Sequence, residues 1–387
     1  MKILALPRND TNPYQELLYQ EFRRRGVEVT YIGSATPSYT LNQLLLPIEL
    51  LVGRLAGARL VHLHWVYNFA PHGGARYLLL RRVGQGWFAL WLWTLRLVGL
   101  RLVWTAHNVL PQQPAFADDL HARRHLISKC AVVIAHSRAT LEELAALGMV
   151  PRSSVVIPHG PFAPAGLPGA PNAPGDPDGP RRLLFFGGIH EYKGVDDLLV
   201  AFAALSPDLN ARLTVAGQCD EALRPALKEL AGRSSGRVTL RLERLPDDEL
   251  TRLLLEAHVA VLPFRRSTTS GSAILALCHG RPIVIPDLPG LAELPTEAAF
   301  RYDCTVQGLT SALTEAILAE DSRLARMSAA ADAYCASMSW QEIAEQTLGV
   351  MRRLLNPGTG VAEGPASRAV GAATERNVQC ESRSGSE

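Results

Sequence analysis

The sequence predicts an α/β protein of two doubly wound domains, each a parallel sheet covered by helices. Short apolar runs alternate with longer amphipathic segments in both halves of the chain, a rhythm typical of βαβ units. The rhythm stops at 160–180, a stretch too rich in Pro and Gly to pack, and restarts after it. We therefore expect a first domain at 1–160, a linker at 161–180 and a second domain at 181–338.

The apolar runs place the elements in order along the chain. The first half should hold strands at 2–6, 27–32, 60–63, 102–105, 132–135 and 155–157, with a first helix at 13–25. The second half should hold strands at 183–186, 212–216, 238–241, 259–262 and 282–285, with helices at 195–205, 221–231, 247–257 and 272–278. A last helix at 339–355 starts with the capping box of Ser339 and Glu342 and should pack back toward the first domain. Residues 357–387 are polar and should be disordered.

Composition narrows the class of protein. The 387 residues are 47% hydrophobic with a formal net charge of +2, which fits a globular protein and does not indicate a nucleic-acid partner. The six cysteines are scattered without metal-ligand spacing, so we expect a reduced, cytoplasmic protein. The nearest approach to a membrane span, 87–103, is interrupted by Arg96 and Arg101.

A stretch in the second half, 263–294, has the pattern of an anion site. A strand runs into Arg265 and Arg266 and then into a small-residue turn that opens a helix. Backbone amides and the helix dipole at such a turn attract negative charge, and arginines add mobile positive charge. We therefore expect a diphosphate at these two arginines and the turn. The turn residues are Thr269, Ser270, Gly271 and Ser272.

A second segment of the same half ends a strand in Gly187 and Gly188 and reaches Lys193 just before a helix. Glycines let a ligand approach the backbone closely, and the lysine ammonium could reach a phosphate there. The alternative is a tight turn with a surface lysine. The small-residue turn at 269–272 in the same half favours the phosphate interpretation.

His107 and Asn108 follow the strand at 102–105, so their polar side chains should project from the carboxyl edge of the sheet. His107 could bind a sugar hydroxyl or act as a general base, and the alternative is a loop histidine that caps a helix. Asp118 and Asp119 lie in the next loop. Either carboxylate could take a proton from an acceptor, although a solvated helix N-terminus is the favoured interpretation.

Two further pairs mark the same edge. His62 and His64 alternate with apolar residues, which would put both on one face of a strand. No third ligand is evident, so a metal site is disfavoured, and substrate lining or a structural role stays open. His159 and Gly160 end the first half and should line the cleft where two such domains face each other.

The segment 75–100 carries arginines among tryptophans and other aromatic residues, a composition that suits an interfacial membrane contact. The alternative is an ordinary helix that covers the sheet. The first interpretation would place the protein at the inner face of the plasma membrane, as a peripheral protein.

Several blocks of sequence together resemble the GT-B glycosyltransferases, closest to the large family 4 group. The blocks, in the family's order, are IPHG at 157–160, FFGGIHEYKGVDDLLVAF at 185–202, LTVAGQ at 213–218, LPDDELTRLLLEAHVAVLPF at 245–264 and ALCHGRPIVIPDLPGLAEL at 276–294. The resemblance covers about 1–355. It implies transfer of a hexosyl group from a UDP- or GDP-linked sugar to a hydroxyl of a glycan, a lipid-linked or a small-molecule acceptor.

The same resemblance implies that the second domain binds the donor and that the acceptor lies against the first. It implies no metal and no other cofactor, because basic side chains and a helix N-terminus hold the diphosphate in this family. Asp287 and Glu293 match the family's D-x-G-G-x-x-E loop.

The chain also departs from the family. Gly188 replaces an arginine of the phosphate turn, residues 7–12 replace a glycine-rich loop, and Ser267 and Leu275 replace the paired glutamates, of which the second binds ribose hydroxyls. An active enzyme with a rebuilt donor site and a noncatalytic homologue that binds a glycan or partner both stay open, with Lys193 favouring activity. A sugar-nucleotide epimerase is disfavoured. Retention is expected, and the alternative is inversion with His107, Asp118 or Asp119 as the base.

Overall fold

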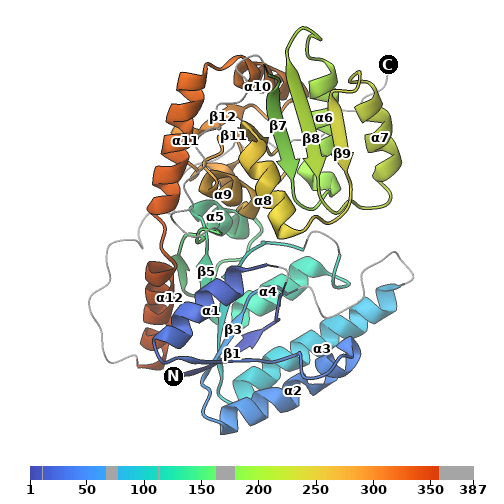
Figure 1. Ribbon diagram of the computed structural model, residues 1–387. Coiled ribbons are helices and arrows are strands. Elements are labelled where there is room, and N and C mark those ends of the chain that lie inside the picture. Colours follow the sequence, from blue (N-terminus) through green and yellow to red (C-terminus); the bar gives the residue numbers. More distant parts are fainter. Residues whose placement is uncertain (11, 67–76, 112–113, 163–178, 357–387) are drawn as a thin grey trace. The chain divides into compact units, whose positions relative to one another are not determined.

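The computed structural model describes residues 1–10, 12–66, 77–111, 114–162 and 179–356. Within them the chain forms two compact units (Figure 1). Unit 1 holds Met1–Gly160 together with 339–356, and unit 2 holds 161–338. The expected linker at 161–180 lies mostly outside the described residues, and the expected disordered tail at 357–387 lies wholly outside them.

Unit 1 is built on a parallel sheet of six strands in the order β2-β1-β3-β4-β5-β6. The strands are β1 Lys2–Leu6, β2 Glu28–Tyr31, β3 Leu60–Leu63, β4 Arg101–Ala106, β5 Cys130–Ala135 and β6 Ser154–Val156. The helices between them are α1 Tyr14–Arg24, α2 Tyr39–Leu55, α3 Leu78–Leu97, α4 Asp119–Lys129 and α5 Arg138–Ala146. Strand β3 is buried along its whole length, as expected for a parallel sheet with both faces covered.

Unit 2 repeats the plan with a second parallel sheet, in the order β12-β11-β10-β7-β8-β9. Its strands are β7 Arg181–Phe186, β8 Ala211–Ala216, β9 Val238–Arg241, β10 Val259–Val261, β11 Ile283–Pro286 and β12 Ala299–Tyr302. Its helices are α6 Val195–Ala203, α7 Arg224–Gly232, α8 Asp247–Glu256, α9 Gly271–Cys278, α10 Val306–Leu318 and α11 Asp321–Ala336. The predicted α/β fold with two parallel sheets is confirmed, although β12, α10 and α11 were not predicted.

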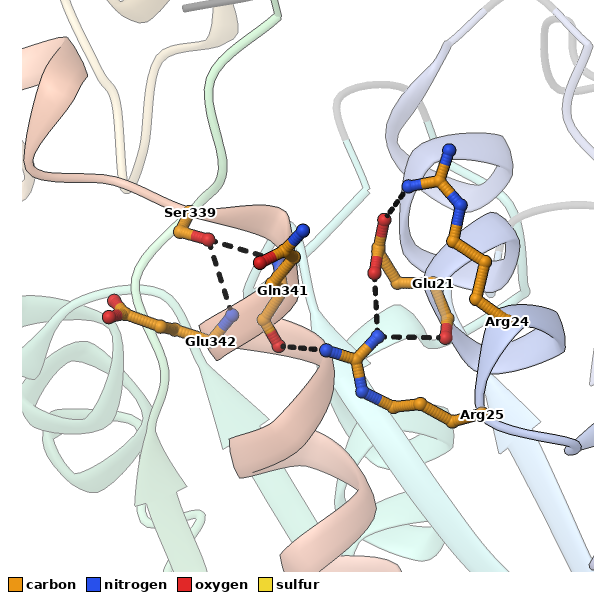
Figure 2. A network of polar contacts seen from close by, with 6 residues as sticks. All are labelled: Glu21, Arg24, Arg25, Ser339, Gln341 and Glu342. Atoms are coloured by element: carbon orange, nitrogen blue, oxygen red, sulfur yellow. Dashed lines mark hydrogen bonds and ion pairs between the residues drawn. The ribbon is translucent and has the colours of Figure 1, made fainter.

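The last helix, α12 (Trp340–Leu355), belongs to unit 1, where it packs along α1 (Figure 1). Figure 2 shows the polar contacts at this junction. Glu21 accepts hydrogen bonds from Arg24 and Arg25, and Arg25 also donates to the carbonyl of Gln341 at 3.3 Å. The Ser339 hydroxyl caps α12 by accepting two amides of its first turn.

Trp340, the first residue of α12, packs over Gly160, the last residue of the longer of the two segments that make up unit 1. A β-carbon on Gly160 would lie 2.4 Å from a ring atom of Trp340, so glycine is required for the backbone to pass beneath the ring. The same ring packs edge-on against Tyr14 of α1, with centroids 5.2 Å apart. Three segments that are distant in the sequence therefore meet at this point of unit 1.

Candidate functional site

The phosphate-binding candidates of unit 2 lie at the carboxyl ends of β7 and β10. These strands are neighbours without being consecutive, so the strand order reverses between them. Ligands of doubly wound sheets bind at such a switch point. The loops that follow the two strands meet there. The Arg265 amide donates to the Tyr192 carbonyl at 2.9 Å, and a β-carbon on Gly194 would lie 2.1 Å from the Pro263 oxygen.

Glycines bring the turn after β7 close to the start of α9. Gly187 adopts a φ of 113°, and a β-carbon there would lie 3.1 Å from the Ser272 hydroxyl. Gly217 passes so near that its β-carbon would lie 1.9 Å from the Gly187 oxygen. At Gly188 a β-carbon would crowd the His190 ring at 2.8 Å. The structure therefore brings together the glycine turn and the small-residue turn that the sequence suggested separately.

The start of α9 presents backbone amides at this edge. Ser270 is buried and caps the helix, because its hydroxyl accepts the Ala273 amide at 3.1 Å. The amides of Gly271 and Ser272 lie ahead of that capped amide, in the first turn, where a helix offers no internal acceptors. Thr269 turns its hydroxyl to the preceding carbonyl at 2.7 Å, so its side chain stabilises the turn itself.

Lys193 lies in the loop between β7 and α6 and is surrounded by aromatic rings. Its ammonium stands 4.1 Å from the centroid of Phe264 and 5.2 Å from that of Tyr192. Burial lowers the pKa of Lys193 to about 8, because the charged form has lost water and no carboxylate of the described chain compensates for it. A bound diphosphate would supply the missing negative charge.

Arg265 and Arg266, predicted as a pair, have different surroundings. The Arg265 guanidinium donates to Asp197 at 2.8 Å, to Asp196 at 2.7 Å and to the Glu191 carbonyl at 3.0 Å. These contacts give Arg265 a structural role, and its predicted contact with the diphosphate stays a prediction. Arg265 joins the loop after β10 to the start of α6, and its donors are turned to protein acceptors rather than to a ligand. Arg266 is exposed and remains a candidate for the diphosphate.

Replacing Arg265 by methionine is expected to lower the free energy of unfolding of unit 2 by about 1–3 kcal/mol, because two carboxylates lose a charged hydrogen-bond donor. Donor affinity should fall less than it does in Lys193→Ala. Urea unfolding followed by hydrogen exchange in unit 2, together with donor titration, measures both. The control is Arg266→Met, at an exposed site where stability should change by less than about 0.5 kcal/mol. If Arg265→Met left the free energy of unfolding unchanged but abolished donor binding, Arg265 would instead be a ligand of the diphosphate.

The carboxyl edge of the unit 1 sheet carries a histidine after each of four neighbouring strands. His64 follows β3, His107 follows β4, His136 follows β5 and His159 follows β6. The ring of Tyr14, from α1, packs against all four with centroid separations of 4.7–5.7 Å. Sequence reasoning missed His136 and Tyr14. The position directly after a parallel strand was the signal that could have found His136.

A single chain of hydrogen bonds runs through these rings. Its members, in order, are Thr105, His62, Tyr19, His64, His107, His136 and the Ile157 carbonyl, with donor–acceptor distances of 2.7–3.3 Å. A carbonyl only accepts, so the His136 Nδ1 must carry a hydrogen and its Nε2 must accept from His107. The same reasoning applies in turn to His107, His64, Tyr19 and His62, so each member of the chain donates to the next one toward the Ile157 carbonyl. Each of its four histidines is therefore the neutral Nδ1–H tautomer.

Burial keeps these histidines neutral. It lowers the pKa of His62 to about 3 and that of His136 to about 4, and it lowers the pKa values of His64 and His107 well below the usual range. His159, whose Nδ1 donates to the next carbonyl at 2.7 Å, has a pKa lowered to about 3 for the same reason. None of the five carries a charge at neutral pH.

The hydrogen-bond chain bears on the role predicted for His107. Its Nε2 accepts from His64 and its Nδ1 donates to His136, so in this arrangement it has no lone pair for a general base. This arrangement disfavours a general base at His107, and the predicted role stays a prediction. Asn108, directly after His107, is half-buried at the same edge of the sheet.

Asp118 and Asp119 lie at the start of α4 and serve the helix. The Asp118 carboxylate caps α4 by accepting the His121 amide at 2.8 Å. Asp119 turns back to accept the Phe116 amide at 2.9 Å. The structure therefore places both carboxylates as the helix N-terminus interpretation describes, and it does not bring either of them into hydrogen-bond contact with His107 among the contacts of the described residues.

The described part of the chain offers no metal site. No group of three His, Cys, Asp or Glu side chains within it is arranged to hold an ion. The buried histidines illustrate the reason, because their ring nitrogens are turned to one another, to hydroxyls and to carbonyls rather than toward a common centre.

Comparison with known proteins identifies the family. Residues 180–320 match the family model described as "Glycosyl transferases group 1", and residues 14–160 match the model described as "Glycosyltransferase Family 4". The chain is a family 4-type glycosyltransferase. The predicted family and the predicted class of enzyme are thus confirmed, and the matched segments cover the sheet of unit 2 and, apart from β1, the sheet of unit 1.

The glycosyltransferase has curated relatives. A GDP-mannose:glycolipid 4-beta-D-mannosyltransferase from Xanthomonas campestris pv. campestris is 26% identical over 280 residues, which cover 72% of this chain and 71% of the relative. A glycogen synthase from Mycobacterium tuberculosis is 29% identical over 179 residues, covering 44% of this chain and 42% of the relative. The first match spans both units, and the second spans less than half of either chain.

Solved structures share the fold of this glycosyltransferase. A sucrose-phosphate synthase from Thermosynechococcus elongatus aligns with a TM-score of 0.68 at 17% identity, over 92% of this chain and 100% of that one. Anabaena HepE in complex with UDP aligns with a TM-score of 0.66 at 15% identity, over 91% of this chain and 99% of that one. These likenesses confirm the two-domain GT-B fold.

The glycosyltransferase lacks carboxylates at the two positions where its family usually has glutamates. Leu275 is half-buried and packs on the core of unit 2. Ser267 lies in the loop after β10, and its backbone carbonyl oxygen would be 2.0 Å from a β-carbon on Gly290. Arg301 of β12 stabilises the loop that holds Gly290, with its Nη1 3.5 Å from Asp287 and its Nη2 donating to two carbonyls. Arg301 was missed because β12 was missed.

Proposed function

We propose that this glycosyltransferase moves a hexosyl group from a nucleotide diphosphate sugar to a hydroxyl of a glycan or lipid-linked acceptor, without a metal ion. Lys193 carries the proposal. It is a desolvated ammonium at the switch point of unit 2, where α9 also presents its first amides. A positive side chain and a helix N-terminus stabilise a departing diphosphate, a task that a metal ion performs in other enzymes.

GDP-mannose is the donor that we propose first, with a glycolipid as the class of acceptor. The Xanthomonas relative, whose match spans most of both chains, is named for these substrates. The UDP in the HepE structure belongs to a protein only 15% identical to this one, so it supports a nucleotide donor more than it supports a particular base. A UDP-linked sugar is the alternative donor.

Retention of anomeric configuration is the stereochemistry that we propose. Inversion would require a general base at the acceptor hydroxyl. His107, Asp118 and Asp119, the candidates from the sequence, are engaged with protein partners, which supports retention. The name of the Xanthomonas relative specifies a beta linkage in its product, which from an alpha-linked nucleotide sugar corresponds to inversion and so speaks for the alternative. Proton NMR of the anomeric centre separates the two: an alpha-linked product supports retention, and a beta-linked product contradicts it.

GDP is expected to raise the melting temperature of unit 2 more than UDP, TDP or ADP in a thermal-shift screen. A ligand at about 100 times its dissociation constant stabilises the native state by about 2.7 kcal/mol, which corresponds to about 5–10 °C for a unit of this size. The shift should persist in EDTA, because side chains and amides hold the diphosphate.

Lys193→Ala, measured beside Lys228→Ala on the exposed face of α7, shows whether the shift comes from this site. A shift that requires Mg²⁺ would contradict the metal-independent proposal. Saturable glycan binding without turnover of a sugar linked to GDP, UDP, TDP or ADP would instead support the noncatalytic homologue.

We also carry forward the membrane contact predicted at 75–100, and with it a location at the inner face of the plasma membrane. Most of this segment forms α3, so the contact would belong to unit 1. A glycolipid acceptor would give such a contact a purpose.

A further inference from the structure

Two helices of unit 1 expose most of the large hydrophobic side chains that are solvent-accessible in the described chain. On α2 these side chains are Leu41, Leu44, Ile48, Leu51, Val52 and Leu55. Their spacing of three or four residues places them along one stripe of the helix. The opposite side of α2 holds Leu46 and Leu50, which are fully buried in the core. The exposed stripe therefore faces away from the sheet.

Helix α3 repeats this division. Its exposed stripe contains Leu79, Val83, Leu90, Trp93 and Leu97, again at intervals that return to one side of the helix. Its other side is anchored in the core of unit 1 by large buried side chains. These are Phe88, Trp91, Leu92 and Leu95. Because α3 is held to the sheet in this way, it can rest on a bilayer surface, and none of the described helices is long and apolar enough to cross one.

The two exposed stripes belong to one surface. The Trp87 indole donates to the Gln43 carbonyl at 2.8 Å, and Arg54 donates to the Val98 carbonyl at 3.1 Å. Both contacts join residues 44 positions apart, so the helices run parallel and side by side (Figure 1). We call the surface made by the exposed stripes of these helices the α2–α3 face.

The α2–α3 face is basic as well as apolar. Helix α3 has no acidic residue and carries the exposed Arg82 and Arg96. The acidic residue of α2, Glu49, accepts the Gly33 amide at 2.8 Å and so is turned toward the protein. Anionic lipid headgroups attract such arginines while the acyl boundary accepts leucine and tryptophan. A second copy of the chain would instead set arginine against arginine.

We propose that the α2–α3 face docks on an anionic phospholipid bilayer, with its apolar stripes at the acyl boundary and its arginines among the headgroups. The proposal rests on the proposed function for its purpose, which is access to a lipid-linked acceptor. It extends the predicted contact at 75–100 to α2, a helix whose sequence had given no such indication.

Sedimentation with vesicles tests the docking without donor or acceptor, so its failure leaves the transferase proposal standing. The protein should bind vesicles that contain about 30% phosphatidylglycerol and bind pure phosphatidylcholine at least about tenfold more weakly. Val52→Glu and Val83→Glu, at positions 59% and 62% exposed, should each weaken binding at least about tenfold. The matched control is Val150→Glu, 76% exposed and outside both helices, which should bind like the wild type.

Arg82→Gln and Arg96→Gln should each reduce binding to the anionic vesicles about fivefold. Glutamate has a higher helix propensity than valine, and glutamine has nearly the same helix propensity as arginine. The variants should therefore keep the wild-type melting temperature. Equal binding by Val52→Glu and the wild type, or an equal loss in Val150→Glu, overturns the proposal. A dimer that the glutamate variants dissociate and that vesicles do not compete with overturns it in favour of a second copy.

Discussion

Lowering the pH from 7.5 to 5.5 is expected to destabilise unit 1 by several kcal/mol. Burial holds the pKa values of His62, His64, His107, His136 and His159 below the usual 6.5, and those of His62 and His159 fall to about 3. The unfolded chain therefore binds more protons than the folded one below pH 6.5, so stability falls as the pH falls. At pH 5.5 each neutral histidine contributes about 1.4 kcal/mol to this loss.

Hydrogen exchange by mass spectrometry at the two pH values, corrected for the intrinsic exchange rate, measures this loss separately for each unit. Unit 2 serves as the internal reference, because burial lowers the pKa of only two of its described histidines, His258 and His279. His159→Asn keeps a donor for the carbonyl that His159 Nδ1 contacts but cannot titrate. This variant should lose about 1.4 kcal/mol of the acid sensitivity. Equal acid sensitivity of the two units would contradict the expectation.

Lys193→Ala is expected to lower kcat/KM at least about tenfold, which is about 1.4 kcal/mol of transition-state stabilisation. The desolvated ammonium lacks an anionic partner in the described chain, so the leaving diphosphate is the charge it is placed to stabilise. Donor affinity should also fall as the pH rises above about 8, where the unliganded Lys193 loses its proton. Steady-state kinetics and donor titration between pH 6.5 and 9.5 measure both effects.

One variant separates the charge of Lys193 from its packing, and a second serves as the control. Lys193→Arg keeps the charge at high pH and should lose the decline above pH 8. Lys228→Ala removes an exposed lysine from the same unit and should leave the kinetics unchanged. A Lys193→Ala enzyme with the wild-type rate would reject the phosphate role.

The fold was largely predictable because the strands of a buried parallel sheet appear in the sequence as short apolar runs, separated by amphipathic segments that form the helices. Strand β12, with the sequence AFRY, escaped because only two of its residues are buried and an arginine stands between them. Helices α10 and α11 follow it and were missed with it.

The site was only partly predictable, since side-chain partners depend on strand order. The glycine turn and the turn before α9 were found, because strand, turn and helix are local patterns. That Arg265 meets Asp196 and Asp197 depends on β7 and β10 being neighbours, which no local pattern records. The histidines were visible one by one, but the order β3-β4-β5 is what joins His64, His107 and His136 into a chain.

The placement of Trp340 over Gly160 and Tyr14 has a consequence for the order of synthesis. Unit 1 begins with the first residues made, yet its cover, α12, is translated only after the whole of unit 2. Until that second sheet is complete, the ring of Tyr14 lacks its contact with Trp340, although its histidine neighbours are already synthesised. Unit 1 is therefore expected to start folding first and to be completed last, and a chain that stops before Trp340 would lack this contact.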